Sequence, residues 1–314
     1  GEEITITTRD VNCSPGLISV NYSGFAEDVK EGEDILLDDG KLLLKALGSN
    51  GLDEVRAKVV QGGLLSSRKG INLPRTMLRL PSLSDKDLRD LDFIMNRNVQ
   101  WIALSFVRTA EDIELLRKKI NSYPGNHPPR IVAKIEKPEA IDNAEAIIKA
   151  SDAIMIARGD LGVEIPQEQV PVIQKKMVKL AIASSKPVIV ATQMMEGMIT
   201  GMRPTRAEVS DVANSVLDGA DALMLSGETS VGLYPVQTVE TMSRIISDIE
   251  NSGIPYQEVQ HIENQDRRIS DSVIMAACDL AKKVNASALI AMTHTGYSAF
   301  RIASHRPASG IFIF

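Results

Sequence analysis

The sequence predicts an α/β protein built on an incomplete (β/α)8 TIM barrel, with a small all-β region and the start of a C-terminal α/β domain. Three observations lead to this fold class. Residues 1–80 carry short β-branched runs separated by turn signals. Residues 81–250 alternate strand-like and helix-like segments. Polar residues end each of these strand-like segments, and residues 251–314 begin another α/β unit.

The composition excludes several classes of protein. The chain has 314 residues and a net charge of −6, so we expect no nucleic-acid partner held by bulk electrostatics. No apolar run approaches the roughly 18 residues of a membrane span, and the polar start GEEITITTRD is unlike a signal peptide. Cys13 and Cys278 are far apart, which indicates two free thiols. We therefore expect a cytoplasmic protein without a membrane partner.

The elements of residues 1–80 are expected to be short strands. The runs with this pattern are ITITT, LISVNYS, DILL, KLLLKAL and EVRAKVV. The tripeptide DDG at residues 38–40 lies between DILL and KLLLKAL, and it predicts a hairpin turn.

Residues 81–250 are expected to alternate five strands with helices. The expected strands are WIALSF, IVAKIE, AIMIARGD, PVIVATQM and ALMLSGET. The expected helices are LSDKDLRDLDFIMNRNV, AEDIELLRKKINSY, EAIDNAEAIIKA, VPVIQKKMVKLAIASS, TRAEVSDVANSVLDG and VQTVETMSRIISDIE. Ser84 should cap the first helix, and Thr205 with Glu208 forms a T-x-x-E capping box.

This alternation fits either an open doubly wound sheet or a β/α barrel. The first strand-to-helix turn has no G-x-G-x-x-G, which argues against a dinucleotide-binding fold. Polar residues at the carboxyl ends of the strands favour the barrel, because barrel active sites lie at that face. They are Ser105, Lys134 with Glu136, Arg158 with Asp160, Thr192 with Gln193, and Ser226 with Glu228. A barrel has eight strands, so we expect three more strands upstream.

Residues 251–314 are expected to start a third domain. ISDSVIMAACDLAKKVN predicts a helix capped by Ser270, ASALIAMT a strand, AFRIASHRP a short helix and GIFIF the next strand. The chain stops in this apolar run, and we expect the domain to be truncated there.

The stretch IVAKIEKPEAI suggests a metal site. Lys134 and Glu136 are two residues apart on a strand and share a face. Asp160 ends the next strand in the same register, and a barrel would bring its carboxylate close to that of Glu136. Two carboxylates suit Mg²⁺ or Mn²⁺. The alternative is that Lys134 and Glu136 only pair with each other on a solvated face.

The neighbouring strand ends suggest what such a metal would act on. Backbone N–H groups around Gly159 and Asp160, before the expected loop LGVEIP, could receive a carboxylate or phosphate. Thr192 would lie on the other side of the substrate. The residues therefore predict a metal-assisted barrel enzyme acting on a small anionic oxo-acid or its phosphate.

The chain resembles the pyruvate kinases over nearly its whole length. The stretches that carry the resemblance are KGINLP (69–74), IALSFVR, AKIEKPEAI, SDAIMIARGDLGVEIP, KPVIVATQMMEGMI, RPTRAEVSDVANSVLDGADALMLSGETSVGLYP and THTGYSAFRIASHRP. The resemblance implies phosphoryl transfer from phosphoenolpyruvate to ADP, giving pyruvate and ATP, which is the last step of glycolysis. It also implies Mg²⁺ (or Mn²⁺), K⁺ in many members, and a homotetramer for the intact enzyme.

The resemblance also assigns roles to particular residues. Lys134 matches the lysine that stabilises charge on the phosphoryl group and the enolate, and Glu136 and Asp160 match the divalent-metal ligands. Thr192 lies where the enolate is protonated, with Ser226 near the same proton relay. The substrate carboxylate would be bound by the segment Ala157, Arg158, Gly159 and Asp160, together with Thr192. Lys69 matches a lysine that reaches the nucleotide phosphates, and residues 1–80 would form an inserted lid.

The sequence departs from the family pattern at both ends. The resemblance places three barrel strands before the lid, with a phosphoryl-binding arginine and most of the K⁺ ligands, and it places more of the C-terminal domain after residue 314. We therefore expect a fragment that is inactive on its own. Two alternatives stay open, a metal-dependent oxo-acid lyase or aldolase and a non-catalytic metal- or anion-binding fragment. The lid and Lys69 argue against the lyase, which needs no nucleotide site.

Overall fold

The computed structural model describes residues 1–314 except 39, 68, 75, 77–81, 126–127 and 255–266. Contacts divide the chain into two compact units. The first consists of Gly1–Phe93 and Gly159–Val170, and the second of Ile94–Arg158 and Pro171–Phe314. The division into domains of residues 1–80, 81–250 and 251–314 stays a prediction.

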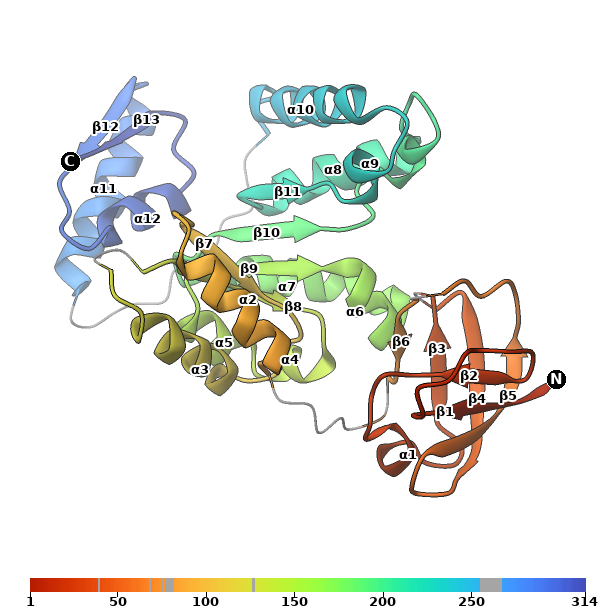
Figure 1. The fold of residues 1–314 in the computed structure, drawn as a ribbon. Helices are drawn as coiled ribbons and strands as arrows, with labels where there is room; N and C mark the ends of the chain where they lie inside the picture. Colours follow the sequence, from red (N-terminus) through yellow and green to blue (C-terminus); the bar gives the residue numbers. More distant parts are fainter. Residues whose placement is uncertain (39, 68, 75, 77–81, 126–127, 255–266) are drawn as a thin grey trace. The chain divides into compact units, whose positions relative to one another are not determined.

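The first unit contains a six-stranded sheet with the order β2-β1-β5-β4-β3-β6 (Figure 1). Its strands are β1 (Glu3–Thr7), β2 (Leu17–Ser19), β3 (Asp34–Leu37), β4 (Leu42–Ser49), β5 (Glu54–Gln61) and β6 (Ile71–Asn72), with the short helix α1 (Phe25–Asp28). Alternate residues of β3 and β4 are buried, among them Ile35 and Leu44, and they pack on Phe25. This alternation lets one face of the sheet form a core.

The expected hairpin between β3 and β4 is present. The two strands pair antiparallel, with Leu37 opposite Leu42. Asp38 has φ 52° and Gly40 has φ 81°, both in the left-handed region that tight hairpin turns require. The middle residue of the DDG turn lies outside the described residues.

The second unit contains a five-stranded parallel sheet with the order β11-β10-β9-β8-β7. The strands are β7 (Trp101–Leu104), β8 (Arg130–Ile135), β9 (Ala153–Ala157), β10 (Val188–Ala191) and β11 (Ala222–Met224). Each strand lies beside its neighbour in the chain, whereas the strand order of a doubly wound sheet reverses at a switch point. This consecutive order confirms the barrel-type interpretation, and β9 is buried along its whole length.

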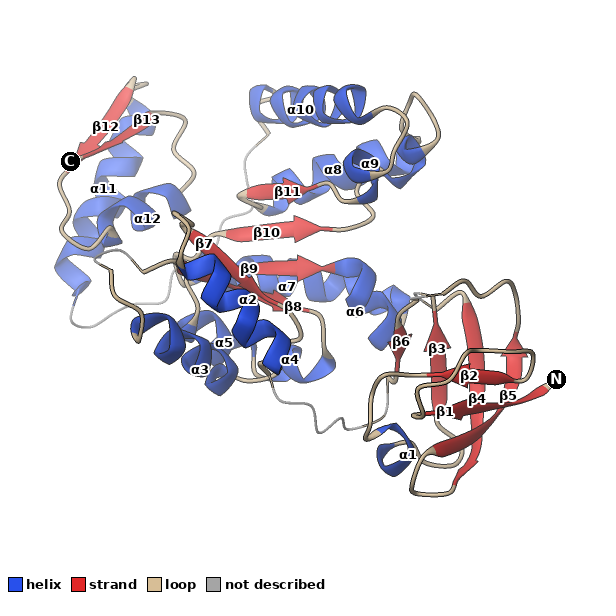
Figure 2. Ribbon diagram, in the orientation of Figure 1, coloured by secondary structure: helices blue, strands red, loops and turns tan. Residues whose placement is uncertain are grey.

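Helices alternate with these strands along the chain (Figure 2). They are α2 (Asp85–Met95), α3 (Ala110–Asn121), α4 (Pro138–Asp142), α5 (Ala144–Ala150), α6 (Arg158–Glu164), α7 (Val170–Ala183), α8 (Arg206–Asp218), α9 (Gly227–Ser230) and α10 (Pro235–Asn251). Helices α3 and α5 pack together, and so do α8 and α10.

Both predicted caps form. The Ser84 hydroxyl accepts the Asp87 N–H at 3.2 Å, and Thr205 accepts the Glu208 N–H at 3.2 Å.

Three sequence-based expectations were wrong in detail. The expected loop LGVEIP is largely helical, because α6 begins at Arg158 and buries Leu161. The single helix expected for EAIDNAEAIIKA is divided at Asn143, whose side-chain amide donates to the Glu139 and Arg108 carbonyls. Ser270 does not cap a helix, since α11 already begins at Arg268.

The C-terminal elements form a small α/β layer within the second unit. They are α11 (Arg268–Lys283), β12 (Ala288–Ala291), α12 (Tyr297–Ser304) and β13 (Gly310–Ile313), and β12 pairs parallel with β13. Arg306, just after α12, lies 2.6 Å from Asp221 at the start of β11. The Arg130 guanidinium lies over the rings of Trp101 and Phe300, 5.5 Å and 4.6 Å from their centroids. These contacts join α12 to the amino-terminal ends of the parallel strands.

None of the helices in the described part of the chain is long and apolar enough to cross a membrane.

Replacing Thr205 with Ala should destabilise the second unit by about 1 kcal/mol, because the capping box at the start of α8 loses its hydroxyl. Denaturant unfolding followed by circular dichroism measures the change. Thr200→Ala, at an exposed position outside the cap, is the control and should have little effect. Equal losses for the two variants would contradict the importance of this cap.

Candidate active site

The candidate site lies at the carboxyl edge of the parallel sheet. Ala157 of β9 pairs with Ala191 of β10, which pairs with Met224 of β11, so these strands end at the same level. The predicted residues in this second unit are Lys134, Glu136, Ala157, Arg158, Thr192 and Ser226. Gly159, Asp160 and Lys69 belong to the first unit. The closeness of Asp160 to Glu136 stays a prediction.

Lys134 and Glu136 point to the same side of β8, as their spacing predicts. The Lys134 Nζ lies 2.5 Å from Glu136 Oε1, and it donates to the Ser105 hydroxyl at 2.8 Å. The other carboxylate oxygen, Oε2, accepts the Phe106 backbone N–H at 2.7 Å. Residues after β7 therefore fix both charged groups at the end of β8.

This pairing was foreseen as the alternative to a metal site, but on a solvated face. The structure instead buries Glu136 and partly buries Lys134, with side-chain exposures of 1% and 22%. Burying an ion pair costs desolvation free energy that the mutual attraction offsets only in good geometry. Stability alone is therefore a weak explanation for two charges in this position.

The Glu136 carboxylate fits the role of a cation ligand. Its Oε1 is buried and has no hydrogen-bond partner within the described residues, since the Lys134 contact lacks hydrogen-bond geometry. A carboxylate oxygen of this kind suits a hard divalent cation. Across the described ranges, no three or more His, Cys, Asp or Glu side chains are grouped to hold a metal. The predicted protein ligands are only two, Glu136 and Asp160.

The Arg158 side chain is directed at the loop after β10. Its Nη2 donates to the carbonyls of Thr192 and Gln193 at 2.8 and 3.1 Å, and its Nε donates to Thr192 at 3.2 Å. Its Nη1 donates to Asp211 of α8 at 2.7 Å and to Gln174 of α7 at 3.3 Å. The guanidinium thus links one loop to two helices.

Thr192 and Gln193 have left-handed backbone conformations, with φ of 68° and 52°. This region is uncommon for residues other than glycine, and a β-branched residue such as Thr is a clear outlier there. Strain of this kind persists only where surrounding groups hold it. The two carbonyls bound by Arg158 belong to these same two residues.

Ser226 follows β11 and shares a partner with the loop after β10. Glu228 accepts the Ser226 N–H on Oε2 at 2.8 Å and the Met195 N–H on Oε1 at 3.2 Å. Its side chain is buried, at 2% exposure. One carboxylate therefore accepts hydrogen bonds from both of the loops that carry Thr192 and Ser226.

In the first unit, Lys69 is held by the hairpin turn after β3. Its Nζ lies 2.8 Å from Asp38 Oδ1, and Lys41 lies 3.4 Å from the other oxygen. The hydrogen bond from Lys69 lowers the pKa of Asp38, opposed by desolvation and assisted by Lys41. Asn72 nearby in sequence donates to Glu164 of α6 at 3.1 Å.

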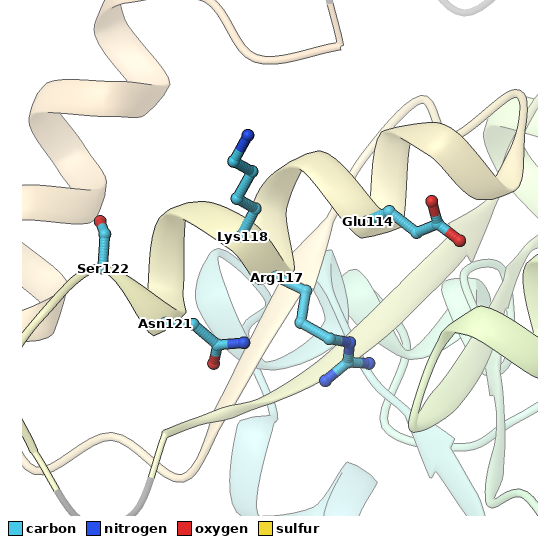
Figure 3. Close-up of a pocket in the computed structure, with 5 residues that line it drawn as sticks. All are labelled: Glu114, Arg117, Lys118, Asn121 and Ser122. Carbon is cyan, nitrogen blue, oxygen red and sulfur yellow. The ribbon is translucent and has the colours of Figure 1, made fainter.

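A surface pocket on α3 is lined by residues with no part in these contacts (Figure 3). They are Glu114, Arg117, Lys118, Asn121 and Ser122. In the close-up, Lys118 points away from Arg117. Arg117 pairs with Asp152 at 3.0 Å, just before β9 begins. The pocket thus lies toward the amino-terminal ends of the strands, opposite the candidate site.

Comparison with known proteins identifies the family. Residues 1–239 match the family described as "Pyruvate kinase, barrel domain". The chain belongs to the pyruvate kinase family. Residues 271–314 match the description "Pyruvate kinase, alpha/beta domain".

Individual relatives agree with this assignment. A pyruvate kinase of Mycobacterium intracellulare is 47% identical over 98% of the chain, and one of Corynebacterium glutamicum is 48% identical over 98%. The chain spans 64% of the length of each relative. The crystal structure of a pyruvate kinase from Cryptosporidium parvum has a TM-score of 0.86 at 37% identity, covering 100% of this chain and 65% of that one.

The sequence did not reveal two of the partners at the site. Asp211 lies on an amphipathic helix, where a partly exposed Asp carries no distinguishing sequence pattern. Gln174 is a buried polar residue on α7, and its position on the buried face of that helix was the available signal. Glu228 was recognised only as a polar strand end.

Replacing Arg158 with Met should lower the free energy of unfolding by about 2 to 4 kcal/mol, because two carbonyls and Asp211 lose a charged donor. Arg158→Lys should lose less, since Lys keeps the charge without the planar fork. Denaturant titration measures both changes. Arg244→Met, at an exposed arginine of α10, is the control; a loss for Arg158→Met no larger than this would refute the bracing role.

Replacing Lys69 with Met should raise the pKa of Asp38 toward its ordinary range, since the Lys69 hydrogen bond is the main cause of its lowering. In the unchanged protein the ion pair should be lost as pH falls through the lowered pKa. A carboxyl-detected NMR titration reports both effects. Lys58→Met, elsewhere on the same sheet, should leave the Asp38 titration where it was.

Proposed function

We propose that the intact protein to which this chain belongs acts as a pyruvate kinase, transferring a phosphoryl group from phosphoenolpyruvate to ADP to give pyruvate and ATP, and that residues 1–314 alone do not complete this transfer. The observation that carries the proposal is the pair of partly buried Lys134 and buried Glu136 at the end of β8, whose carboxylate has one oxygen without a hydrogen bond to any described residue. Family membership supplies the reaction for which this pair is suited. The reaction would take place in the cytoplasm.

Lys134 would stabilise the charge of the reaction. Its ammonium group is partly buried and held by Ser105 and Glu136. A fixed cation in a site of low polarity interacts more strongly with developing negative charge than it would in water. Phosphoryl transfer depends mainly on such positioning and electrostatic stabilisation. We assign Lys134 to the transferring phosphoryl group and to the enolate oxygen of pyruvate.

Glu136 and Asp160 would hold Mg²⁺ (or Mn²⁺). The fit rests on the buried Oε1 of Glu136, which is paired with Lys134 but accepts no hydrogen bond within the described residues, and on the position of Asp160 in the first turn of α6, directly after β9. The bound cation would supply Lewis-acid stabilisation of substrate oxygens. K⁺ is proposed as a second cation by analogy with the family.

The substrate carboxylate would be bound at the junction of β9 and α6. We propose that Ala157, Arg158, Gly159 and Asp160 act there through the backbone, with Thr192 beside them. Arg158 is assigned to the backbone because its guanidinium bonds Thr192, Gln193 and Asp211 instead.

Thr192 and Ser226 are proposed for protonation of the enolate carbon, and Lys69 for the nucleotide phosphates. Both hydroxyls follow neighbouring parallel strands of the sheet, and Lys69 is presented by the β-sheet unit, which would act as a lid. The proposed partners are phosphoenolpyruvate with pyruvate and ADP with ATP, and the proposed assembly is a homotetramer.

The comparisons give no support to the oxo-acid lyase or aldolase alternative. ADP separates it from the kinase experimentally. Pyruvate formed from phosphoenolpyruvate by a kinase requires ADP and is matched by an equal amount of ATP. Cleavage of an oxo-acid that proceeds equally well without ADP would favour the lyase.

The metal site is tested by calorimetric titration with Mn²⁺ in the presence of oxalate, which resembles the enolate of pyruvate. Binding should depend on both components, and Glu136→Gln and Asp160→Asn should each weaken it at least about tenfold, as the loss of a charged ligand implies. Glu139→Gln, an exposed carboxylate three residues away on α4, is the matched control. If the first two variants bind as well as the control, the assigned ligands are wrong.

A further inference from the structure

Glu228 is a buried carboxylate to which the proposed reaction assigns no role. It lies on the short helix α9, after β11, and is 2% exposed. Oε2 accepts the N–H of Ser226 at 2.8 Å, two residues earlier in the chain. Oε1 accepts the N–H of Met195 at 3.2 Å, from the loop after β10. Each carboxylate oxygen therefore accepts a hydrogen bond from a different loop.

The two bonded loops carry the two hydroxyls proposed for proton transfer. Ser226 is bonded directly, and Met195 is three residues after Thr192. The opposite end of the same segment is held by Arg158, which bonds the carbonyls of Thr192 and Gln193. Residues 192–195, the first part of the loop after β10, are thus held at one end by a cation and at the other by an anion.

Only a carboxylate of this length matches the pair of donors. Two N–H groups from separate loops need two acceptor oxygens, and ionised Glu has two acceptors and no donor. Gln offers one oxygen and one NH₂ group, so one of the amides would face a donor. Asp keeps both oxygens on a side chain shorter by one methylene group.

We propose that Glu228 is a positioning residue. It holds the hydroxyl groups of Thr192 and Ser226 in the relative positions needed to protonate the enolate, an inference that rests on the proposed function. It is not a catalytic residue, because both of its oxygens are bonded to backbone amides and its side chain is buried. Hydrogen bonds from N–H groups to an ionised, buried carboxylate are among the stronger ones in proteins. One side chain thereby couples two loops that are separated in the chain by α8 and β11.

The first experiment measures the coupling without any substrate. Amide hydrogen exchange and Thr192 methyl signals are recorded by NMR for the unchanged chain, Glu228→Gln and Glu228→Asp. The matched control is Glu196→Gln, which changes an exposed carboxylate directly after Met195. In Glu228→Gln, exchange at Ser226 or Met195 should rise roughly tenfold to a hundredfold, as loss of a charge-assisted hydrogen bond implies. The Thr192 methyl signal should move, while β9 amides stay protected.

The second experiment separates positioning from general destabilisation. Incorporation of deuterium into the methyl group of pyruvate is followed by NMR in D₂O with Mg²⁺. A methyl C–H bond breaks, its proton leaves to the site, its electron pair forms the enolate, and a deuteron from solvent forms the new C–D bond. Glu228→Gln should slow this exchange roughly tenfold or more, and Mg²⁺–oxalate affinity should fall by less, since the proposed metal ligands Glu136 and Asp160 are unchanged.

The outcomes distinguish the inference from the function on which it rests. Unchanged amide exchange at both Ser226 and Met195 with an unmoved Thr192 methyl signal would overturn the proposal. So would deuterium exchange in Glu228→Gln equal to that of Glu196→Gln. If the unchanged chain neither binds Mg²⁺–oxalate nor exchanges pyruvate protons, the proposed function fails for this chain. The amide and methyl measurements then still decide whether Glu228 couples the two loops.

Discussion

The parallel pairing of five consecutive strands is the constraint on which the candidate site depends. Because β7 to β11 run in one direction and lie in chain order, all of their carboxyl ends meet at one edge. The opposite edge is fixed by aspartates that precede β9 and β11. Asp152 and Asp221 accept the N–H groups of Ile131 and Val188 in the neighbouring strands, both at 2.8 Å. Shifting any strand by one residue would turn its site residue to the other face.

Two carboxylates at this edge are buried. Their burial costs desolvation free energy, but their positions allow them to organise the candidate site. Glu136 and Glu228 are both nearly fully buried, and each spends hydrogen-bonding capacity on loop amides. The two carboxylates differ in the hydrogen bonding of one oxygen atom. Both oxygens of Glu228 accept hydrogen bonds, which suits a structural link, whereas Oε1 of Glu136 lies beside Lys134 and accepts no hydrogen bond from the described residues. The same residue type is thereby directed to two purposes by what surrounds it.

Hydrophobic periodicity and capping signals were enough to predict the five parallel strands and most of the helices. The box of Thr205 with Glu208 formed as predicted because its contacts are local. Local signals failed where distant contacts decide. The RGDLGVE segment contains two glycines, yet it is helical with Leu161 buried. The direction of the Arg158 side chain depended on α7 and α8, so no pattern around residue 158 could reveal it.

The loop after β10 shows why the fold tolerates strain at its candidate site. A glycine at position 192 would take φ 68° at little cost, but it would carry no hydroxyl. The chain has Thr192 there and Gln193 after it, both left-handed. The free energy that this conformation costs has to be offset by neighbouring contacts. Arg158 supplies them at the two strained carbonyls, and Glu228 supplies one at Met195. A reactive hydroxyl and a rigid loop are therefore obtained together only because charged groups from two neighbouring strand ends converge on the loop.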